Sequence, residues 1–328
     1  MADRRIKEIL LIPEIPAGLR SAHLIGGKIV PFIGAGLSKL AGCPTWSELA
    51  NICLHHFIKT GELNYCAVEQ LKHLSPRVKL TLAMRLNKQS QQKINFEEIF
   101  SRSKEPESLG SRAYCAIQQI ANIFLTTNYD SCLKYKDTGG VMRAGDSVGS
   151  TLEVIERNRI YKKEDFRPDV LTKSDTVIHL HGSEHDPESM IITTQDYATH
   201  YARDRDGDEN PVLTFLAYLF SQKTTLFVGY GLEELEILEY ICKGQTARQD
   251  PQPSHYLIQG FFSHELYLAN EMYSYYNDLG IELIPFARDD HDWAQMTFVL
   301  EAFSKQIPAQ PILAIEKRAE MGRLLENE

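Results

Sequence analysis

The chain has 328 residues, 43% of them hydrophobic and 24% charged, a composition typical of a folded globular protein rather than a disordered one. A formal net charge of −9 without a long Lys/Arg run argues against a broad nucleic-acid-binding face, so no direct nucleic-acid binding is expected. No segment approaches the roughly 20 apolar residues of a membrane span, and the N-terminus does not resemble a signal peptide. We therefore expect a cytoplasmic protein with one large core and a smaller module.

Short apolar runs rich in Val, Ile, Phe and Leu alternate with longer amphipathic segments along the chain. Most of these runs lack a polar residue at every second position, as expected for strands buried on both faces. The pattern predicts an α/β fold with a Rossmann-like, doubly wound parallel sheet. The predicted strands are 28–33, 121–125, 176–180, 224–228, 255–258 and 281–285, and the predicted helices are 47–58, 67–87, 211–222, 233–243, 263–279 and 291–306.

The predicted elements are unevenly spaced. Most of the residues between the first two strands have a helical pattern, which indicates an inserted helical module at about 47–118 rather than a structureless loop. A second insertion, partly helical and exposed, is predicted at about 135–175. These insertions belong to a main domain at 28–306, preceded by an N-terminal extension at 1–27 and followed by a tail at 307–328.

Two glycine turns follow predicted strands. In Gly34-Ala35-Gly36 the missing Cβ atoms would let backbone N–H groups approach a pyrophosphate, although a plain turn explains the pattern as well. Lys39 stands where the Rossmann fingerprint has Gly or Ala, so this is not the usual dehydrogenase loop. A second turn begins at Gly229, and two such junctions in one sheet can hold both ends of a dinucleotide.

Polar residues follow two further predicted strands. Asn128 and Asp130 come after one of them, where ligands bind in open α/β sheets, although both could simply cap a turn. His179 and His181 are two residues apart on a strand and could share a face, which leaves a metal-site interpretation open. The residues that follow do not continue the usual metal-hydrolase spacing, and the six cysteines show no zinc-like spacing, so no metal is expected.

Taken in order, five motifs resemble those of the sirtuin-like family, and most closely its bacterial branch of NAD-hydrolysing antiphage-defence proteins. They are GAGLS at 34–38, GCPTW at 42–46, TTNYD at 126–130, HLHGS at 179–183 and LFVGYGLEE at 226–234. The resemblance implies that Asn128 orders the ribose hydroxyls and the attacking water, and that His181 is the general base. The cofactor-binding positions that it implies are Gly34, Ala35, Gly36, Ser38, Trp46, Thr127, Asp130, Gly229, Tyr230 and Gly231, of which Tyr230 and Gly231 depart from the Thr-Ser of the family.

The resemblance also implies an activity. Protein-deacylating sirtuins carry a four-cysteine zinc module between the matched histidine and the matched glycine, whereas this chain has no cysteine between Cys132 and Cys242. The implied function is therefore an NAD glycohydrolase, with NAD as substrate and no zinc or other metal, acting as a regulated effector of antiphage defence by NAD depletion. One alternative is a sensor subunit that binds NAD or ADP-ribose without turnover, and another is an NAD-dependent deacylase or ADP-ribosyltransferase.

Such proteins commonly act with partners. The resemblance implies a homo-oligomer and a separate partner protein, such as a hexameric translocating ATPase or an Argonaute-like protein. The helical insertion and the tail are the segments through which we expect assembly.

Overall fold

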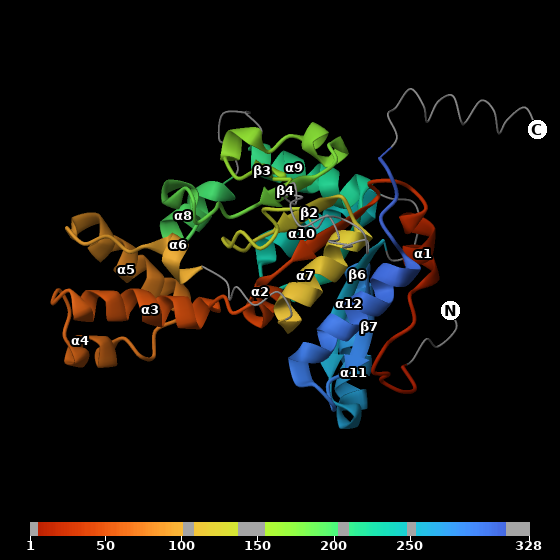
Figure 1. The fold of residues 1–328 in the computed structure, drawn as a ribbon, viewed down its shortest axis with the longest axis horizontal. Coiled ribbons are helices and arrows are strands. Elements are labelled where there is room, and N and C mark those ends of the chain that lie inside the picture. The colour runs from red at the N-terminus through yellow and green to blue at the C-terminus, as the bar shows by residue number, and fades with distance from the viewer. Residues whose placement is uncertain (1–5, 101–107, 137–154, 203–209, 248–253, 313–328) are drawn as a thin grey trace, which may run out of the picture.

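A parallel β-sheet of seven strands forms the centre of the molecule, in the order β3-β4-β2-β1-β5-β6-β7. The computed structural model describes residues 6–100, 108–136, 155–202, 210–247 and 254–312 (Figure 1). The strands are β1 (Ile29–Ile33), β2 (Ile123–Thr126), β3 (Asn158–Ile160), β4 (Thr176–His179), β5 (Thr224–Val228), β6 (His255–Phe261) and β7 (Ile281–Ala287).

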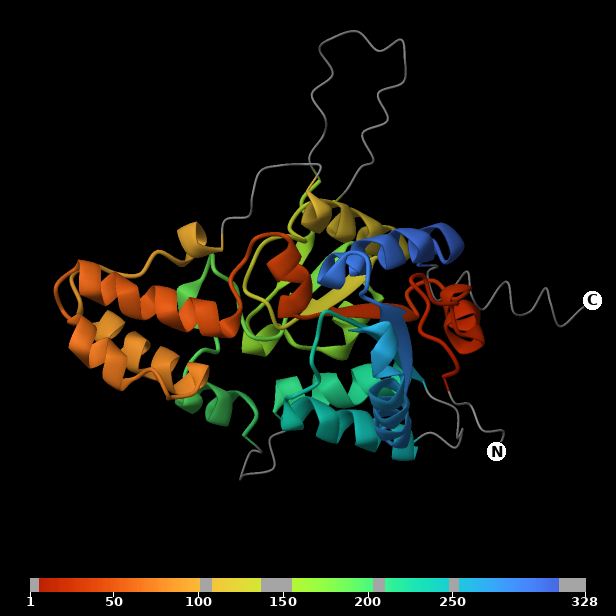
Figure 2. The ribbon, with the colours of Figure 1, turned by 90° about the horizontal axis from the view of Figure 1, so that it is seen from below.

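Helices cover both faces of this sheet. Figure 2 shows α7 and α12 on one side of the strands and α9, α10 and α11 on the other. The α-helices are α1 (Ala17–His23), α2 (Ala35–Leu40), α3 (Trp46–Lys59), α4 (Tyr65–Gln70), α5 (Pro76–Gln89), α6 (Phe96–Ile99), α7 (Leu109–Ile120), α8 (Thr194–His200), α9 (Pro211–Gln222), α10 (Leu235–Ala247), α11 (Leu266–Asp278) and α12 (Gln295–Gln306). Short 3₁₀ turns lie at Lys163–Asp165, Pro168–Thr172, Pro187–Ser189, Ser263–Glu265 and Asp292–Ala294.

The central strand β1 shows why the sheet is covered twice. All of its residues are buried, with Ile29 and Ile33 in the apolar cluster that contains α7 and α12. Val30 and Phe32 point the other way, into the cluster that contains α9 and α11. Successive side chains of a strand alternate between faces, so an apolar run without alternation needs apolar cover on both. The predicted doubly wound parallel fold is confirmed.

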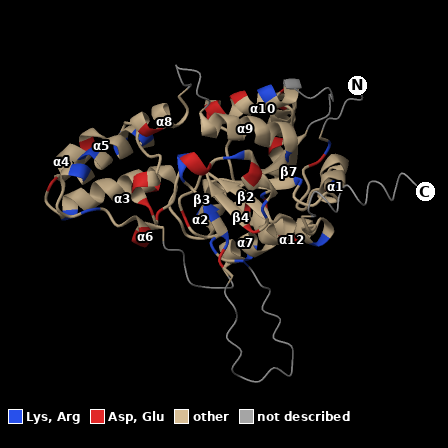
Figure 3. Ribbon diagram, turned by 90° about the horizontal axis from the view of Figure 1, so that it is seen from above, with Lys and Arg blue, Asp and Glu red and all other residues tan. Residues whose placement is uncertain are grey.

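Between β1 and β2 the chain forms helices α3 to α6, which project from one side of the sheet (Figure 1). Helix α3 starts with a capping box in which Thr45 and Glu48 each satisfy the other's backbone N–H, as the pattern predicts. The predicted helix 67–87 is instead two helices, α4 and α5. Ser75 caps the second helix and Pro76 occupies its first turn, because proline lacks the N–H that a helix interior needs. Residues of both charge signs occur on these helices (Figure 3).

The second insertion contributes more to the sheet than its composition indicates. Its described part, 155–175, contains β3, which pairs in parallel with β4 and forms one edge of the sheet. Such a short, partly exposed strand has no long apolar run to reveal it. Residues 137–154 of this insertion, and the tail from 313 onward, lie outside the described residues. Within the described ranges, no helix combines the length and apolarity that crossing a bilayer requires.

Candidate functional site

Strands β1 and β5 are neighbours at the point where the order of the strands reverses. From β1 the sheet continues through β2 in one direction and through β5 in the other. The two glycine junctions that follow β1 and β5 touch through their backbones. Gly34 N–H donates to Val228 O at 3.0 Å, and Gly36 N–H donates to Gly229 O at 2.8 Å. Ligands bind at such a switch point in open α/β sheets.

This backbone contact explains why both junctions need glycine. A Cβ on Gly34 would lie 2.5 Å from the Gly229 carbonyl oxygen, and a Cβ on Gly229 would lie 2.4 Å from Leu37 N. Gly229 also has a φ of 62°, in the region that favours glycine. Two of the N–H groups expected to face a pyrophosphate, those of Gly34 and Gly36, thus hydrogen-bond within the protein.

Ser38, on α2, joins the predicted residues into one polar network. Asn128 Nδ2 donates to Ser38 Oγ at 2.6 Å, and Ser38 Oγ donates to Asp130 Oδ2 at 2.7 Å. Ser38 has a single hydroxyl proton, which goes to Asp130. In the 2.9 Å contact between Tyr114 Oη and Ser38 Oγ, the tyrosine hydroxyl is therefore the donor. Among the described residues no hydrogen bond reaches Asn128 Oδ1, so this atom is available to a ligand.

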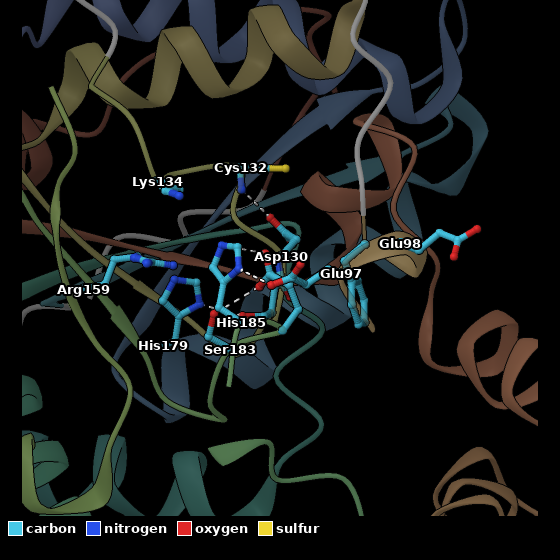
Figure 4. Close-up of polar contacts among 12 residues, drawn as sticks. Glu97, Glu98, Asp130, Cys132, Lys134, Arg159, His179, Ser183 and His185 are labelled. Carbon is cyan, nitrogen blue, oxygen red and sulfur yellow. Dashed lines mark hydrogen bonds and ion pairs between the residues drawn. The ribbon is translucent and has the colours of Figure 1, made fainter. Parts of the chain in front are cut away.

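The turn after β2 is fixed by bonds to its neighbours. Thr126 Oγ1 donates to the carbonyl of Ile33 on β1 and accepts from Asn128 N, both at 2.9 Å. His179 Nδ1 donates to the Asn128 carbonyl at 3.0 Å, and burial lowers the pKa of this histidine, so it is neutral. Figure 4 shows His179 below the Asp130 turn. His179 therefore supports the backbone of Asn128 from β4.

A narrow pocket, partly open to solvent and with a cavity volume of about 20 Å³, lies against this network. Six of the predicted site residues line it: Ala35, Ser38, Trp46, Thr127, Asn128 and Asp130. The remaining lining is mostly apolar and comes from Cys43, Pro44, Leu49, Phe100 and Tyr129. A mostly apolar wall with a few convergent polar groups is typical of a small-molecule site.

His181 lies in a second, adjoining cluster. Its side chain is fully buried, with Nε2 2.8 Å from Tyr201 Oη and Nδ1 3.2 Å from Tyr197 Oη. Burial, and then the charges of His200 and Arg77, lower its pKa well below the ordinary value, so the ring is neutral. The expected general base is therefore neutral, as required, but both of its ring nitrogens are engaged in this conformation.

Tyr197 connects the two clusters. Its ring centroid lies 6.1 Å from that of Trp46, which lines the pocket, and 5.0 Å from that of His181. Arg77 of α5 lies over the same ring, 4.0 Å from its centroid. The sequence did not point to three tyrosines of this site, Tyr114, Tyr197 and Tyr201, because the spacing of a tyrosine on or next to a helix does not distinguish it from a core aromatic.

Two of the remaining predicted positions, Tyr230 and Gly231, do not line this pocket. The ring of Tyr230 packs in the apolar core, 4.6 Å from Phe32, so its side chain is not exposed to a ribose. Gly231 is exposed. A tyrosine in place of the threonine of the family is large enough to reach that core, which accounts for the difference.

Glu234 was expected only to favour the start of a helix. Its Oε2 lies 3.4 Å from His181 Nε2, and its side chain is 16% exposed. Burial raises the pKa of this carboxyl to about 7, and the negative charge of Glu236 contributes to the rise. The position just before α10 was visible in the sequence, but the contact with His181 was not.

The helical module also contacts the loop after β4. His185 Nδ1 lies 2.9 Å from Glu97 Oε1 on α6 (Figure 4), and its Nε2 lies 3.7 Å from Glu184 Oε1. Among the described residues, the one group of three potential metal ligands is Cys43, Asp130 and Cys132, whose ligand atoms lie within 4.8 Å of one another. His179 and His181 do not belong to it, so the predicted alternative of a metal-binding HxH pair has no third ligand among the described residues.

A doubly wound parallel sheet with a pocket beyond the carboxyl ends of β1 and β2 defines a Rossmann-like α/β protein. The sequence model of the SIR2-like domain matches residues 122–284, and the chain belongs to this sirtuin-like family. The match includes Asn128, His181 and Gly229, whereas the first glycine junction precedes it. No curated protein matches the chain significantly. Members of the family are usually NAD-dependent enzymes, so NAD-related activity follows at this general level.

Proposed function

We propose that the protein is an NAD glycohydrolase that converts NAD and water into nicotinamide and ADP-ribose. The pocket carries this proposal. It brings Ser38, Trp46 and Asn128 together beyond the carboxyl ends of β1 and β2, and these residues come from segments far apart in the chain. The family uses NAD. The Asn128 amide, held by Ser38, suits contact with the ribose, and the nearby Trp46 indole suits contact with the nicotinamide.

The reaction needs little acid catalysis. The C1′–N1 bond breaks with its electron pair passing to nicotinamide, which leaves as a neutral group, and the ribose passes through an oxocarbenium-like state. Water then forms a bond to C1′ and releases one proton. Asn128 Oδ1 is free to accept a hydrogen bond from a ribose hydroxyl or from the water, and a neutral His181 is able to take the proton.

Water is favoured over acyl-lysine as the acceptor. The chain between His181 and Gly229 contains α8 and α9 and has no cysteine from which a zinc module could be built. The proposed biological role is NAD depletion in antiphage defence, silent until a partner protein triggers it. Engagement of both His181 nitrogens by tyrosines is consistent with a resting state.

The test measures nicotinamide release from NAD by the purified chain, alone and with the product of its neighbouring gene. Asn128→Ala and His181→Ala should each lower the rate by on the order of 100-fold or more. Asn51→Ala, an exposed position on α3 outside the pocket, is the matched control and should keep the wild-type rate.

Three outcomes would contradict the proposal. Unchanged rates in both site variants would exclude the assigned roles of the two residues. Tight NAD binding without turnover under every condition would indicate a sensor subunit. Nicotinamide release that requires an acyl-lysine peptide would indicate a deacylase.

A further inference from the structure

The side chain of Glu234 points in a direction that is unusual for a carboxylate next to the start of a helix. A carboxylate just before a helix usually faces solvent and interacts with the helix dipole, as exposed Glu233 can. Glu234 instead turns inward, to within 3.4 Å of a fully buried histidine. Its Oε2 makes no well-aligned hydrogen bond among the described residues, although His181 Nε2 lies 3.4 Å away. Burying a carboxyl group is unfavourable unless a partner compensates it, and His181 is the nearest imidazole.

The contacts of His181 allow two arrangements of its single ring proton. With the proton on Nε2, this nitrogen donates to Tyr201 Oη with the Glu234 carboxylate 3.4 Å away, and the Tyr197 hydroxyl donates to Nδ1. With the proton on Nδ1, the direction of both hydrogen bonds reverses, and Nδ1 can no longer accept a proton. The tautomer of His181 thus decides which nitrogen is basic.

We propose that Glu234 is the positioning residue of His181: its carboxylate holds the ring proton on Nε2, so that Nδ1 is the nitrogen that takes a proton during NAD cleavage. A carboxylate at this place also stabilises the imidazolium ion that forms when Nδ1 is protonated, as in other histidine–carboxylate pairs. The inference rests on the proposed function and names a further residue of that site.

In this proposal the charge of Glu234 determines which ring nitrogen of His181 carries the proton. When its carboxyl is protonated, it can no longer attract Nε2–H, and the Nδ1–H tautomer becomes competitive. The groups that face Glu234 are His181 beyond β4, Tyr129 beyond β2, Tyr197 of α8, Tyr201 just after α8, Tyr230 beyond β5, Arg77 of α5 and Glu236 of α10. Of these, Arg77 and Tyr230 favour the carboxylate, whereas Glu236 disfavours it.

The decisive experiment follows the tautomer by NMR of the full chain labelled with ¹⁵N-histidine, with the His181 signals assigned from their loss in His181→Gln. In the wild type these signals should shift towards the Nε2–H tautomer as the pH rises through about 7, although the ring stays neutral. Glu234→Gln has nearly the same shape without the charge and should abolish this shift. Glu233→Gln removes a charge one residue away and should leave it unchanged.

A rate measurement gives a second readout. The rate of nicotinamide release should rise with pH through about 7 in the wild type and in Glu233→Gln. In Glu234→Gln this rise should disappear, and the rate at pH 8 should fall by on the order of 10- to 100-fold. A residue with a purely structural role would change stability without moving the pH profile.

The two proposals fail differently. If the chain releases no nicotinamide under any condition, the proposed function is wrong, and the NMR titration still decides whether Glu234 controls His181. If nicotinamide is released while Glu234→Gln keeps the wild-type rate and pH profile, the pairing is wrong. A wild-type His181 signal that does not change between pH 6 and 8 would also overturn it, even if the Gln variant failed to fold.

Discussion

Tyr197 Oη lies 3.2 Å from Nδ1 of His181, so the nitrogen that we assign as the base is covered by a phenol. Arg77 lies over the same ring, with its guanidinium carbon 4.0 Å from the ring centroid. Helix α8 therefore connects the helical module to the proposed base. Access of a substrate proton to Nδ1 requires this hydroxyl to move.

Tyr197→Phe should raise the rate of nicotinamide release. The phenylalanine keeps the ring between Trp46 and His181 but removes the hydrogen bond to Nδ1. Such a bond is worth about 1 kcal/mol, so the gain should be up to about fivefold. Tyr201→Phe is the control, because Tyr201 contacts Nε2, which is not the proposed base. Equal effects of the two variants would show that Tyr197 does not cover the base.

Gly229→Ala should destabilise the fold and abolish NAD cleavage. The new Cβ would lie 2.4 Å from Leu37 N at a φ of 62°, so the two glycine junctions would have to separate. We expect a loss of about 2 kcal/mol or more in unfolding free energy, measured by urea titration. Gly231→Ala is the matched control, because its Cβ would meet no atom closer than 3.5 Å. A Gly229→Ala protein of wild-type stability would contradict the packing described.

The pH dependence of stability should reveal the burial of Glu234. Its pKa rises from 4.5 to about 7 on folding, so between these pH values the folded chain keeps a proton that the unfolded chain has released. The resulting stabilisation is complete below pH 4.5 and is lost as the pH rises to 7, by about 3 kcal/mol.

The measurement compares urea unfolding of the wild type and Glu234→Gln from pH 4.5 to 8. Buried His181 and His200 act oppositely, because their lowered pKa values remove stability as the pH falls below 6.5. Both proteins contain these histidines, so the difference isolates the pH dependence that Glu234 introduces, including its effect on His181. A difference that is independent of pH would show that Glu234 ionises normally.

Removal of metal should leave NAD cleavage unchanged. Cys43, Asp130 and Cys132 lie close enough to hold an ion, but Asp130 already accepts hydrogen bonds from Ser38 Oγ and Cys132 N. The hydrogen bond with Cys43, and then burial, raise the pKa of the Cys132 thiol, and a protonated thiol is a poor ligand. Chelator treatment followed by metal analysis and a rate measurement checks this. Loss of activity that Zn²⁺ restores would contradict it.

The sequence predicted the sheet well where burial leaves a simple pattern. All six predicted strands exist, because a strand covered on both faces is a mostly apolar run without regular alternation, as β1 is. The edge strand β3 was missed for the opposite reason, since a short and partly exposed strand carries no such run. The break between α4 and α5 could have been predicted from Ser75-Pro76.

The sequence by itself determined which residues meet at the carboxyl end of the sheet. Strand ends of a parallel sheet lie at one edge, so Ser38, Asn128 and Asp130 had to be neighbours once the strands were placed. Only the tertiary structure decided what surrounds His181. Tyr197, Tyr201 and Glu234 reach it because α8 and the second glycine junction pack against the end of β4. Contacts of this kind depend on how separate segments pack, and no periodicity along the chain records them.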